Sequence, residues 1–444
     1  MDHVIFSREF FGSFNNFVDY KYVLGDNAFT RSGKVSLASA IKYPLLNTKK
    51  TTTIEANKFI RQELGDSSMT LTKQGISDRM QYIDPQVYID MNNAMTSKIY
   101  SEADDLDSFK DFKVFAIDGS IIELPNIKLT REEFGINNFT LLKKHTTSAR
   151  ISCMSDVKTN YIISSNIAYK GVHEIEHALY HLEDVKDRID LSKVITIYDR
   201  GYPSTEIMLK TILLNSYFVM RAKTITFKHE QSKMKTNDET FEIKLNNPKI
   251  NRFHNEELKK IAQKIPSIKI RIVKVKLKNG TEETLITNLP KETATPEELK
   301  QLYGDRWTIE TNYEKLKNKL QIEKFSGRKK IRIEQDFYSD ILIFNLLMTV
   351  KHDADQKIKR KPKKSNKYEY KYQTNFNTLT GQIKEMMPYL LTDNQEQINQ
   401  IMDNIIEIAS KDLVYTKINP PTNKERDKKR YSPKKCKSNL KQSF

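Results

Sequence analysis

Residues 303–317 read Tyr-Gly-Asp-Arg-Trp-Thr-Ile-Glu-Thr-Asn-Tyr-Glu-Lys-Leu-Lys, and this stretch carries the most informative spacing in the chain. A continuous α-helix advances about 100° per residue, so four polar side chains here fall within an arc of about 60°. They are Tyr303, Arg306, Glu310 and Lys317. An apolar stripe runs beside them, so the predicted helix packs one edge and presents a carboxylate between two cations on the next. Residues 295–298, Thr-Pro-Glu-Glu, predict a capping box at its start, and Gly304 is an unfavourable residue within it.

A carboxylate beside Arg and Lys is equally well explained as a solvated salt-bridge face. Two aspartates elsewhere favour a functional site. Asp118 follows Lys-Val-Phe-Ala-Ile and precedes Gly119, while Asp199 follows Lys-Val-Ile-Thr-Ile-Tyr and precedes Arg200. Each acid is predicted where a buried strand ends and the chain turns, and ligands of α/β proteins gather outside such strand ends. Either aspartate alone is more simply a turn residue, but both acids together with the polar stripe indicate a site.

Three carboxylates are the ligand set that two-metal phosphoryl transfer requires. Mg²⁺ prefers oxygen ligands and keeps several waters. Two such ions can activate an attacking oxygen and stabilise the leaving oxygen of an in-line displacement. This chemistry requires no histidine or cysteine ligand.

The acids and the spacing Tyr-x2-Arg-x3-Glu-x6-Lys resemble the catalytic set of DDE transposases of the bacterial insertion-sequence family four. The neighbouring sequences agree, with Ile-Asp-Gly-Ser at 117–120 and Tyr-Asp-Arg-Gly-Tyr-Pro-Ser at 198–204. The resemblance covers about residues 60–350. It implies that Asp118, Asp199 and Glu310 lie on an RNase H-like fold and bind two Mg²⁺ ions, for which Mn²⁺ can substitute.

The resemblance also implies a reaction and its partners. The enzyme would be a polynucleotidyl transferase and endonuclease that cleaves at terminal inverted repeats, frees a 3′-hydroxyl and joins it to target DNA. Tyr303, Arg306 and Lys317 would grip the phosphates of the transposon end, and Arg200 is a further predicted DNA contact. Double-stranded DNA is thus the expected partner, held by a homodimer in the bacterial cytoplasm at the nucleoid.

The predicted fold class is α/β, with an RNase H-like catalytic core interrupted by a β-rich insertion and flanked by helical N-terminal and C-terminal regions. Strands are expected at residues 150–158, 161–169, 193–198, 217–221, 240–245, 268–277 and 284–288, and helices at 174–189 and 204–214. Asn279-Gly280 predicts a hairpin turn. The predicted domains are an end-binding region (1–105), the core (106–223 and 291–352), the insertion (224–290), and a basic linker, helical region and basic tail (353–444).

Composition supports a nucleic-acid partner. The chain carries 74 Lys and Arg against 57 Asp and Glu, a formal net charge of +17, and such an excess attracts phosphate backbones. Basic clusters at residues 357–364 and 424–437 are either solvated segments or phosphate contacts. Two cysteines without paired spacing fit a reducing compartment. The apolar run 341–350, read as part of a helix that begins near Asp336, is too short to span a bilayer, so no membrane partner is expected.

Residues 70–80 have the rhythm of a helix, a turn at Gly75 and a second helix. In a helix-turn-helix the second helix enters the major groove, which makes Lys73 and Arg79 candidates for end recognition. The alternative is an ordinary helical hairpin, which the residues alone favour. Residues 375–415 are expected to form one or two helices that carry dimer contacts.

Two other functions stay open. His173-Glu174-x-x-His177 matches the H-E-x-x-H pattern of zinc peptidases, and His181 follows one turn later on the same predicted helical face. The helix equally fits the first helix of the core, with these residues facing solvent. The second alternative is a catalytically inactive DNA-binding protein derived from a transposase. The intact acids argue against it, but the sequence leaves open whether the protein is active and whether excision uses hairpin intermediates.

Overall fold

The computed structural model describes residues 3–31, 33–103, 106–139, 144–277, 280–358, 363–365 and 368–417. The chain divides into two compact units. The first unit combines residues up to Ile99 with Ile122–Ser148 and the chain from Lys315 onward. The second unit consists of Tyr100–Ile121 and Ala149–Glu314.

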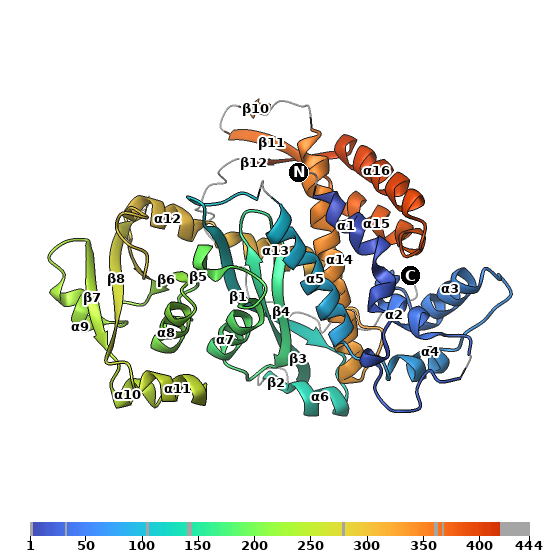
Figure 1. The fold of residues 1–444 in the computed structure, drawn as a ribbon, viewed down its shortest axis with the longest axis horizontal. Helices are drawn as coiled ribbons and strands as arrows, with labels where there is room; N and C mark the ends of the chain where they lie inside the picture. The colour runs from blue at the N-terminus through green and yellow to red at the C-terminus, as the bar shows by residue number, and fades with distance from the viewer. Residues whose placement is uncertain are drawn as a thin grey trace. The chain divides into compact units, whose positions relative to one another are not determined.

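A mixed sheet of nine strands, most of them in the second unit, has the order β2-β3-β1-β5-β6-β9-β8-β7, with β4 paired to β3 (Figure 1). The strands are β1 Lys113–Leu124, β2 Ile136–Phe139, β3 Lys144–Asp156, β4 Ile162–Tyr169, β5 Val194–Tyr198, β6 Tyr217–Ala222, β7 Asp238–Lys244, β8 Ser267–Lys276 and β9 Glu282–Thr287. β5 is parallel to both β1 and β6. All five residues of β5 are buried, as expected for a central parallel strand rich in β-branched side chains.

Helices connect the parallel strands. The helices of this unit are α7 Glu174–Val185, η3 Leu191–Lys193, α8 Thr205–Leu213, α9 Lys228–Lys233, α10 Asn247–Ile250, α11 Glu256–Ala262 and α12 Pro296–Gly304, and α13 Trp307–Asn318 continues into the other unit. α7 packs on β4 and α8 packs on β6. Ser204 caps α8 by accepting a hydrogen bond from the Glu206 amide. The predicted alternation of strands and helices is therefore confirmed.

The β-rich stretch predicted at 224–290 contributes β7, β8 and β9, which extend the same sheet by antiparallel pairing. β8 and β9 form a hairpin that closes at Gly280, whose φ of +80° favours glycine. Its amide bonds to the Leu277 carbonyl. Gly280 thus occupies the predicted turn, while Asn279 lies outside the described residues.

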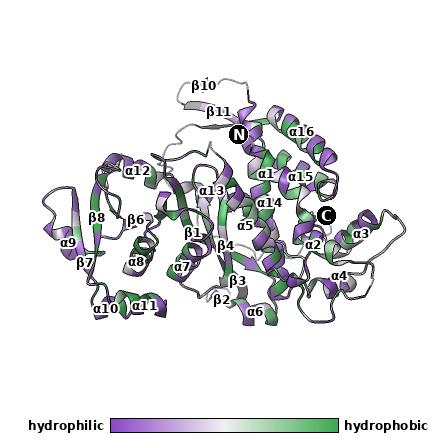
Figure 2. Cartoon of the chain, viewed as in Figure 1, coloured by the Kyte–Doolittle hydropathy of each residue, from purple (hydrophilic) through white to green (hydrophobic). Residues whose placement is uncertain are grey.

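The first unit is mainly helical. Its helices are α1 Val4–Gly12, η1 Phe14–Phe17, η2 Tyr20–Tyr22, α2 Leu37–Leu45, α3 Thr52–Leu64, α4 Lys73–Met80, α6 Lys128–Phe134, α14 Lys330–Gln356, α15 Phe376–Leu390 and α16 Gln395–Lys411, and α5 Gln86–Glu102 begins in it. α14 packs against α1, α2, α15 and α16. A small sheet consists of β10 Lys363–Ser365, β11 Tyr368–Thr374 and β12 Leu413–Lys417. α14 contains both hydrophobic and hydrophilic residues along its length (Figure 2). Its buried polar groups Asp340 and Asn345 are paired with Lys49 and Asn92.

Three predictions for this unit can be compared with the structure. The helix expected near Asp336 begins earlier, at Lys330. The turn predicted at Gly75 is wrong, because Gly75 lies inside α4 and its amide bonds to the capping hydroxyl of Thr72. The two C-terminal helices are confirmed as α15 and α16. The cluster at 424–437 and residues 359–362 of the cluster at 357–364 lie outside the described residues. Within the described ranges, no helix is long and apolar enough to cross a bilayer.

Candidate active site

The parallel register of β1 and β5 brings two of the predicted acids together. The last register pair is Ile117 with Tyr198, so Asp118 and Asp199 come next on neighbouring strands, where backbones run about 4.8 Å apart. The two apolar runs predicted a strand before each acid, and β1 and β5 confirm these strands.

The prediction that the first strand ends at Asp118 is wrong, because β1 continues to Leu124. β3 lies next to β1 on the side away from β5, so β1 can continue after its pairing with β5 stops. The Asp118 carbonyl accepts hydrogen bonds from the Tyr313 hydroxyl at 2.6 Å and the Ser152 hydroxyl at 3.2 Å. Its carboxylate accepts a bond from the Gly119 amide at 2.9 Å. Hydrogen bonds from β3 and from α13 therefore hold the backbone at Asp118.

The single helix predicted through the signature is two helices. α12 ends at Gly304 and α13 begins at Trp307, with a turn at 305–306. The cause is the low helix propensity of Gly304, and the Asp305 amide bonds back to the carbonyls of the last turn of α12. The predicted capping box at Thr295 is confirmed. Despite the break, the Tyr303 hydroxyl donates to Asp199 Oδ1 at 3.1 Å.

Arg306 lies among all three acids. Its Nη2 donates to Glu310 Oε1 at 2.9 Å, Nη1 is 3.7 Å from Asp118 Oδ2, and Nε is 3.9 Å from Asp199 Oδ1. The side chain is only 8% exposed. The guanidinium also lies 5.9 Å from the ring centroid of Tyr303 and 5.6 Å from that of Trp307. One cation therefore interacts with three carboxylates beside the point where the pairing of β1 with β5 ends.

Burial has the largest effect on the ionisation of Asp118. Burial raises the pKa of Asp118 to about 6, opposed by the Gly119 amide and by Arg306. The charges of Asp199 and Glu310 raise this pKa further. A cation brought to these carboxylates would favour the ionised form of Asp118.

The donor set can be compared with the requirements of a divalent ion. Three carboxylates fit the preference of Mg²⁺ for oxygen ligands. Within the described ranges, however, no three His, Cys, Asp or Glu side chains have the spacing needed to hold one metal ion. The present spacing is that of carboxylates arranged around a guanidinium.

The other predicted DNA contacts are more scattered. Arg200 is exposed at the turn after Asp199. Lys317 lies on α13 in the part that belongs to the first unit. Lys73 is exposed at the start of α4, while the Arg79 guanidinium packs 5.4 Å from the ring centroid of Phe29.

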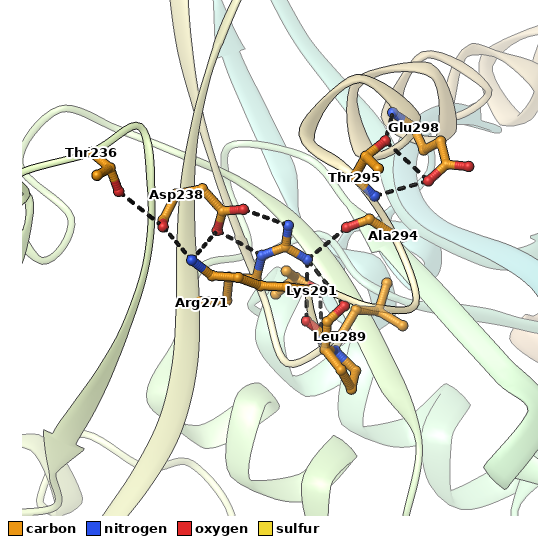
Figure 3. A network of polar contacts seen from close by, with 10 residues as sticks. Thr236, Asp238, Arg271, Leu289, Lys291, Ala294, Thr295 and Glu298 are labelled. Atoms are coloured by element: carbon orange, nitrogen blue, oxygen red, sulfur yellow. Dashed lines mark hydrogen bonds and ion pairs between the residues drawn. The ribbon is translucent and has the colours of Figure 1, made fainter.

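A clamp around Arg271 holds the chain that leads into α12 (Figure 3). This side chain on β8 is 3% exposed and makes two hydrogen bonds of 2.8 Å to the Asp238 carboxylate on β7. Its Nη1 donates to the carbonyls of Leu289, Pro290 and Ala294. Arg271 was not among the predicted site residues, because Lys269 and Lys274 flank it in the run 268–275 and nothing local distinguishes it from an exposed cation.

The H-E-x-x-H histidines have other partners. His173 precedes α7 as its cap and accepts a hydrogen bond from the Ile175 amide, so the predicted single helical face of three histidines is wrong. His177 and His181 are buried rather than solvent-facing. The ring nitrogens of His181 lie 2.8 Å and 2.9 Å from the hydroxyls of Ser164 and Ser152. Burial lowers the pKa of His177 to about 4 and that of His181 to about 3. Neutral, buried rings fit a packing role.

A protein-family model matches this chain. The family model of the transposase DDE domain matches residues 110–346, which is more than half of the chain. A cryo-EM structure of a piggyBac transposase synaptic complex with hairpin DNA is similar with a TM-score of 0.41 and 10% identity. That similarity covers 95% of this chain and 81% of the other. None of the curated proteins matches.

Proposed function

The chain belongs to the transposase DDE domain family, and on that premise we propose that it is a cut-and-paste DNA transposase of insertion-sequence family four. The observation that carries the proposal is the arrangement of Asp118, Asp199 and Glu310 around one guanidinium at the end of a parallel strand pair. These three residues are the proposed catalytic and metal-binding set, on a core that we take to be RNase H-like.

The reaction would proceed in two displacements. Two Mg²⁺ ions, or Mn²⁺ in their place, would supply an activated water and stabilise the leaving oxygen when held by the three carboxylates. Water attack on the phosphodiester at the element's end breaks the bond to the 3′ oxygen and leaves a 3′-hydroxyl. That hydroxyl then attacks a target phosphodiester in the same site, forming one ester bond as another breaks.

The protein's own groups position these reactants. Tyr303 orients the Asp199 carboxylate through its hydroxyl. We assign Arg306, Lys317 and Arg200 to the phosphates of the bound end, since arginine and lysine neutralise backbone charge. Lys73 and Arg79 belong to the proposed end-binding region. Two protomers would hold two ends, and the net charge of +17 fits such a DNA partner in the bacterial nucleoid.

Strand cleavage tests the proposal. The protein is incubated with a labelled duplex carrying the inverted repeat that flanks its gene, with Mg²⁺ or with EDTA. We expect Mg²⁺-dependent nicking at the repeat terminus, lost in Asp199→Ala and in Glu310→Gln, both of which keep end binding. Glu256→Gln is the matched control, because Glu256 is a well-exposed acid on α11. Normal cleavage by Glu310→Gln would show that the assigned acids are wrong.

Two other results would favour the alternatives. Specific binding of the repeat without cleavage, under conditions that assemble both ends, would support an inactive DNA-binding protein. Neither binding nor cleavage, together with stoichiometric zinc in the purified protein, would support the peptidase pattern of His173, Glu174 and His177.

A further inference from the structure

The Arg306 guanidinium lies among the three carboxylates that would coordinate a metal ion. It faces Asp118, Asp199 and Glu310 at distances of 2.9–3.9 Å, and its side chain is 8% exposed. Mg²⁺ binds oxygen ligands at about 2.0–2.1 Å. Carboxylate oxygens that surround a guanidinium cannot close to that distance around an ion, and two cations in one small site repel each other.

The Arg306 side chain is held mainly by ion pairs and makes few hydrogen bonds. Among the described residues, the only hydrogen bond of the Arg306 side chain is from Nη2 to Glu310, and the buried Nε has no hydrogen-bond partner there. The contacts with the two aspartates are longer ion pairs. The residue lies in the turn between α12 and α13, outside both helices. Charge attraction, rather than a fixed hydrogen-bond network, therefore holds the guanidinium in place.

We infer that Arg306 is the cation bound to the three carboxylates when DNA is absent, and that its guanidinium and divalent ions bind these carboxylates in mutually exclusive states. A DNA phosphate then attracts the guanidinium away from them. This inference rests on the proposed function, since it names the regulation of the same site. A phosphate attracts arginine because the guanidinium can form two parallel charge-assisted hydrogen bonds with it. Withdrawal of Arg306 leaves three carboxylates without their cation, so metal affinity rises when DNA binds, and by linkage DNA affinity rises with metal. The site would thus stay without catalytic metal until a strand is present.

Metal binding in the absence of DNA tests this inference. Mg²⁺ and Mn²⁺ are titrated into the protein by calorimetry, comparing wild type with Arg306→Gln. An opposite charge within 4–6 Å shifts ionisation equilibria by about 1–3 log units, so we expect the variant to bind the ions at least about tenfold more tightly. Arg188→Gln is the matched control, because Arg188 also forms a hydrogen-bonded pair with an acid four residues away, Asp184. It should bind metal as wild type does.

The chain's single tryptophan provides a second readout in the unaltered protein. Trp307 is 58% exposed, and the Arg306 guanidinium lies 5.6 Å from its ring centroid. We expect the wild-type emission to change with Mg²⁺ along the calorimetric binding curve, and the change to be absent in Arg306→Gln. This measurement keeps the inference testable if the variant does not fold.

Three outcomes would overturn the inference. The first is equal or weaker metal binding by a folded Arg306→Gln variant, and the second is no change in wild-type Trp307 emission at saturating Mg²⁺. The third is equal metal affinity in Arg306→Gln and in the double variant Arg306→Gln/Asp199→Asn. The last result would place the metal elsewhere. These results are separable from the cleavage assay. Cleavage by wild type with unchanged metal affinity in the variant would refute the inference alone. Tighter metal binding by the variant, in a protein that never cleaves its repeat, would refute the proposed function alone.

Discussion

Replacement of Arg271 by methionine tests the clamp that leads into α12 (Figure 3). The substitution keeps much of the side-chain volume but removes two 2.8 Å hydrogen bonds to Asp238 and a 2.8 Å bond to the Ala294 carbonyl. Removing one partner of a buried ion pair costs about 3–5 kcal/mol, because the other charge stays buried without compensation. Asp238 keeps Lys291, 3.8 Å from its Oδ1, and its side chain is 19% exposed. We therefore expect the low end of that range, about 3 kcal/mol.

Urea unfolding measures this loss, followed by Trp307 emission, which reports on the unit containing the clamp, and by circular dichroism. Arg271→Lys should fall between methionine and wild type, since lysine keeps the charge but not the planar fork. The double variant Arg271→Met/Asp238→Leu removes the stranded carboxylate and should recover much of the loss. A cost below about 1 kcal/mol for the single variant, within the range of an ordinary hydrogen bond, would refute the clamp. Losses that simply add in the double variant would refute the coupling.

The remaining predictions concern the site and the first unit. Tyr303→Phe removes the donor to Asp199 and should slow cleavage of the labelled duplex by about tenfold, near 1.4 kcal/mol. Lys317→Ala should weaken end binding and lower the slope of log K against log salt by about one, with unchanged metal affinity by calorimetry. Burial raises the pKa of Glu334 from 4.5 to about 7, opposed by Lys330, so its stabilising contribution is present below pH 4.5 and is lost as the pH rises through 7. Glu334→Gln should therefore have a free energy of unfolding about 1–3 kcal/mol above that of wild type at pH 8, and a value near wild type at pH 4.5. Urea unfolding at the two pH values measures this, and equal free energies at pH 8 would contradict it.

The strand before each aspartate was predictable because the evidence for it is local, whereas the pairing of β1 with β5 that brings the two acids together is not. β5 is a five-residue run of buried apolar and β-branched side chains, and such a run indicates a central strand whose end can carry a ligand. The continuation of β1 past Asp118 was not predictable. It depends on β3 lying beside β1, and that pairing joins residues distant in sequence. Gly119 is a residue type common in turns, but it lies inside β1, which pairs with β3.

Helical periodicity predicted one continuous helix through Tyr303, Arg306 and Glu310, and the backbone there is two helices. An angular projection assumes one uninterrupted helix, whereas Gly304 ends α12 and Trp307 starts α13. The Arg306–Glu310 contact survives the break, because it spans four residues across the start of α13. The Tyr303–Asp199 contact depends on tertiary placement and has no periodic signal. The burial of His177 and His181 was missed for the same reason, since their partners include residues of β3 and β4.

The break at 305–306 has a mechanical consequence for the site. Tyr303 belongs to α12, whose entry is held by the Arg271 clamp and by the pairing of Lys110 with Glu298 at 2.7 Å. Glu310 belongs to α13, which is fixed separately through the Tyr313 hydroxyl on the Asp118 carbonyl. Arg306 lies between these two anchored helices, in a turn of only two residues. A turn can absorb backbone rotation that a helix interior cannot, so Arg306 can leave the carboxylates while Tyr303 and Glu310 keep their positions.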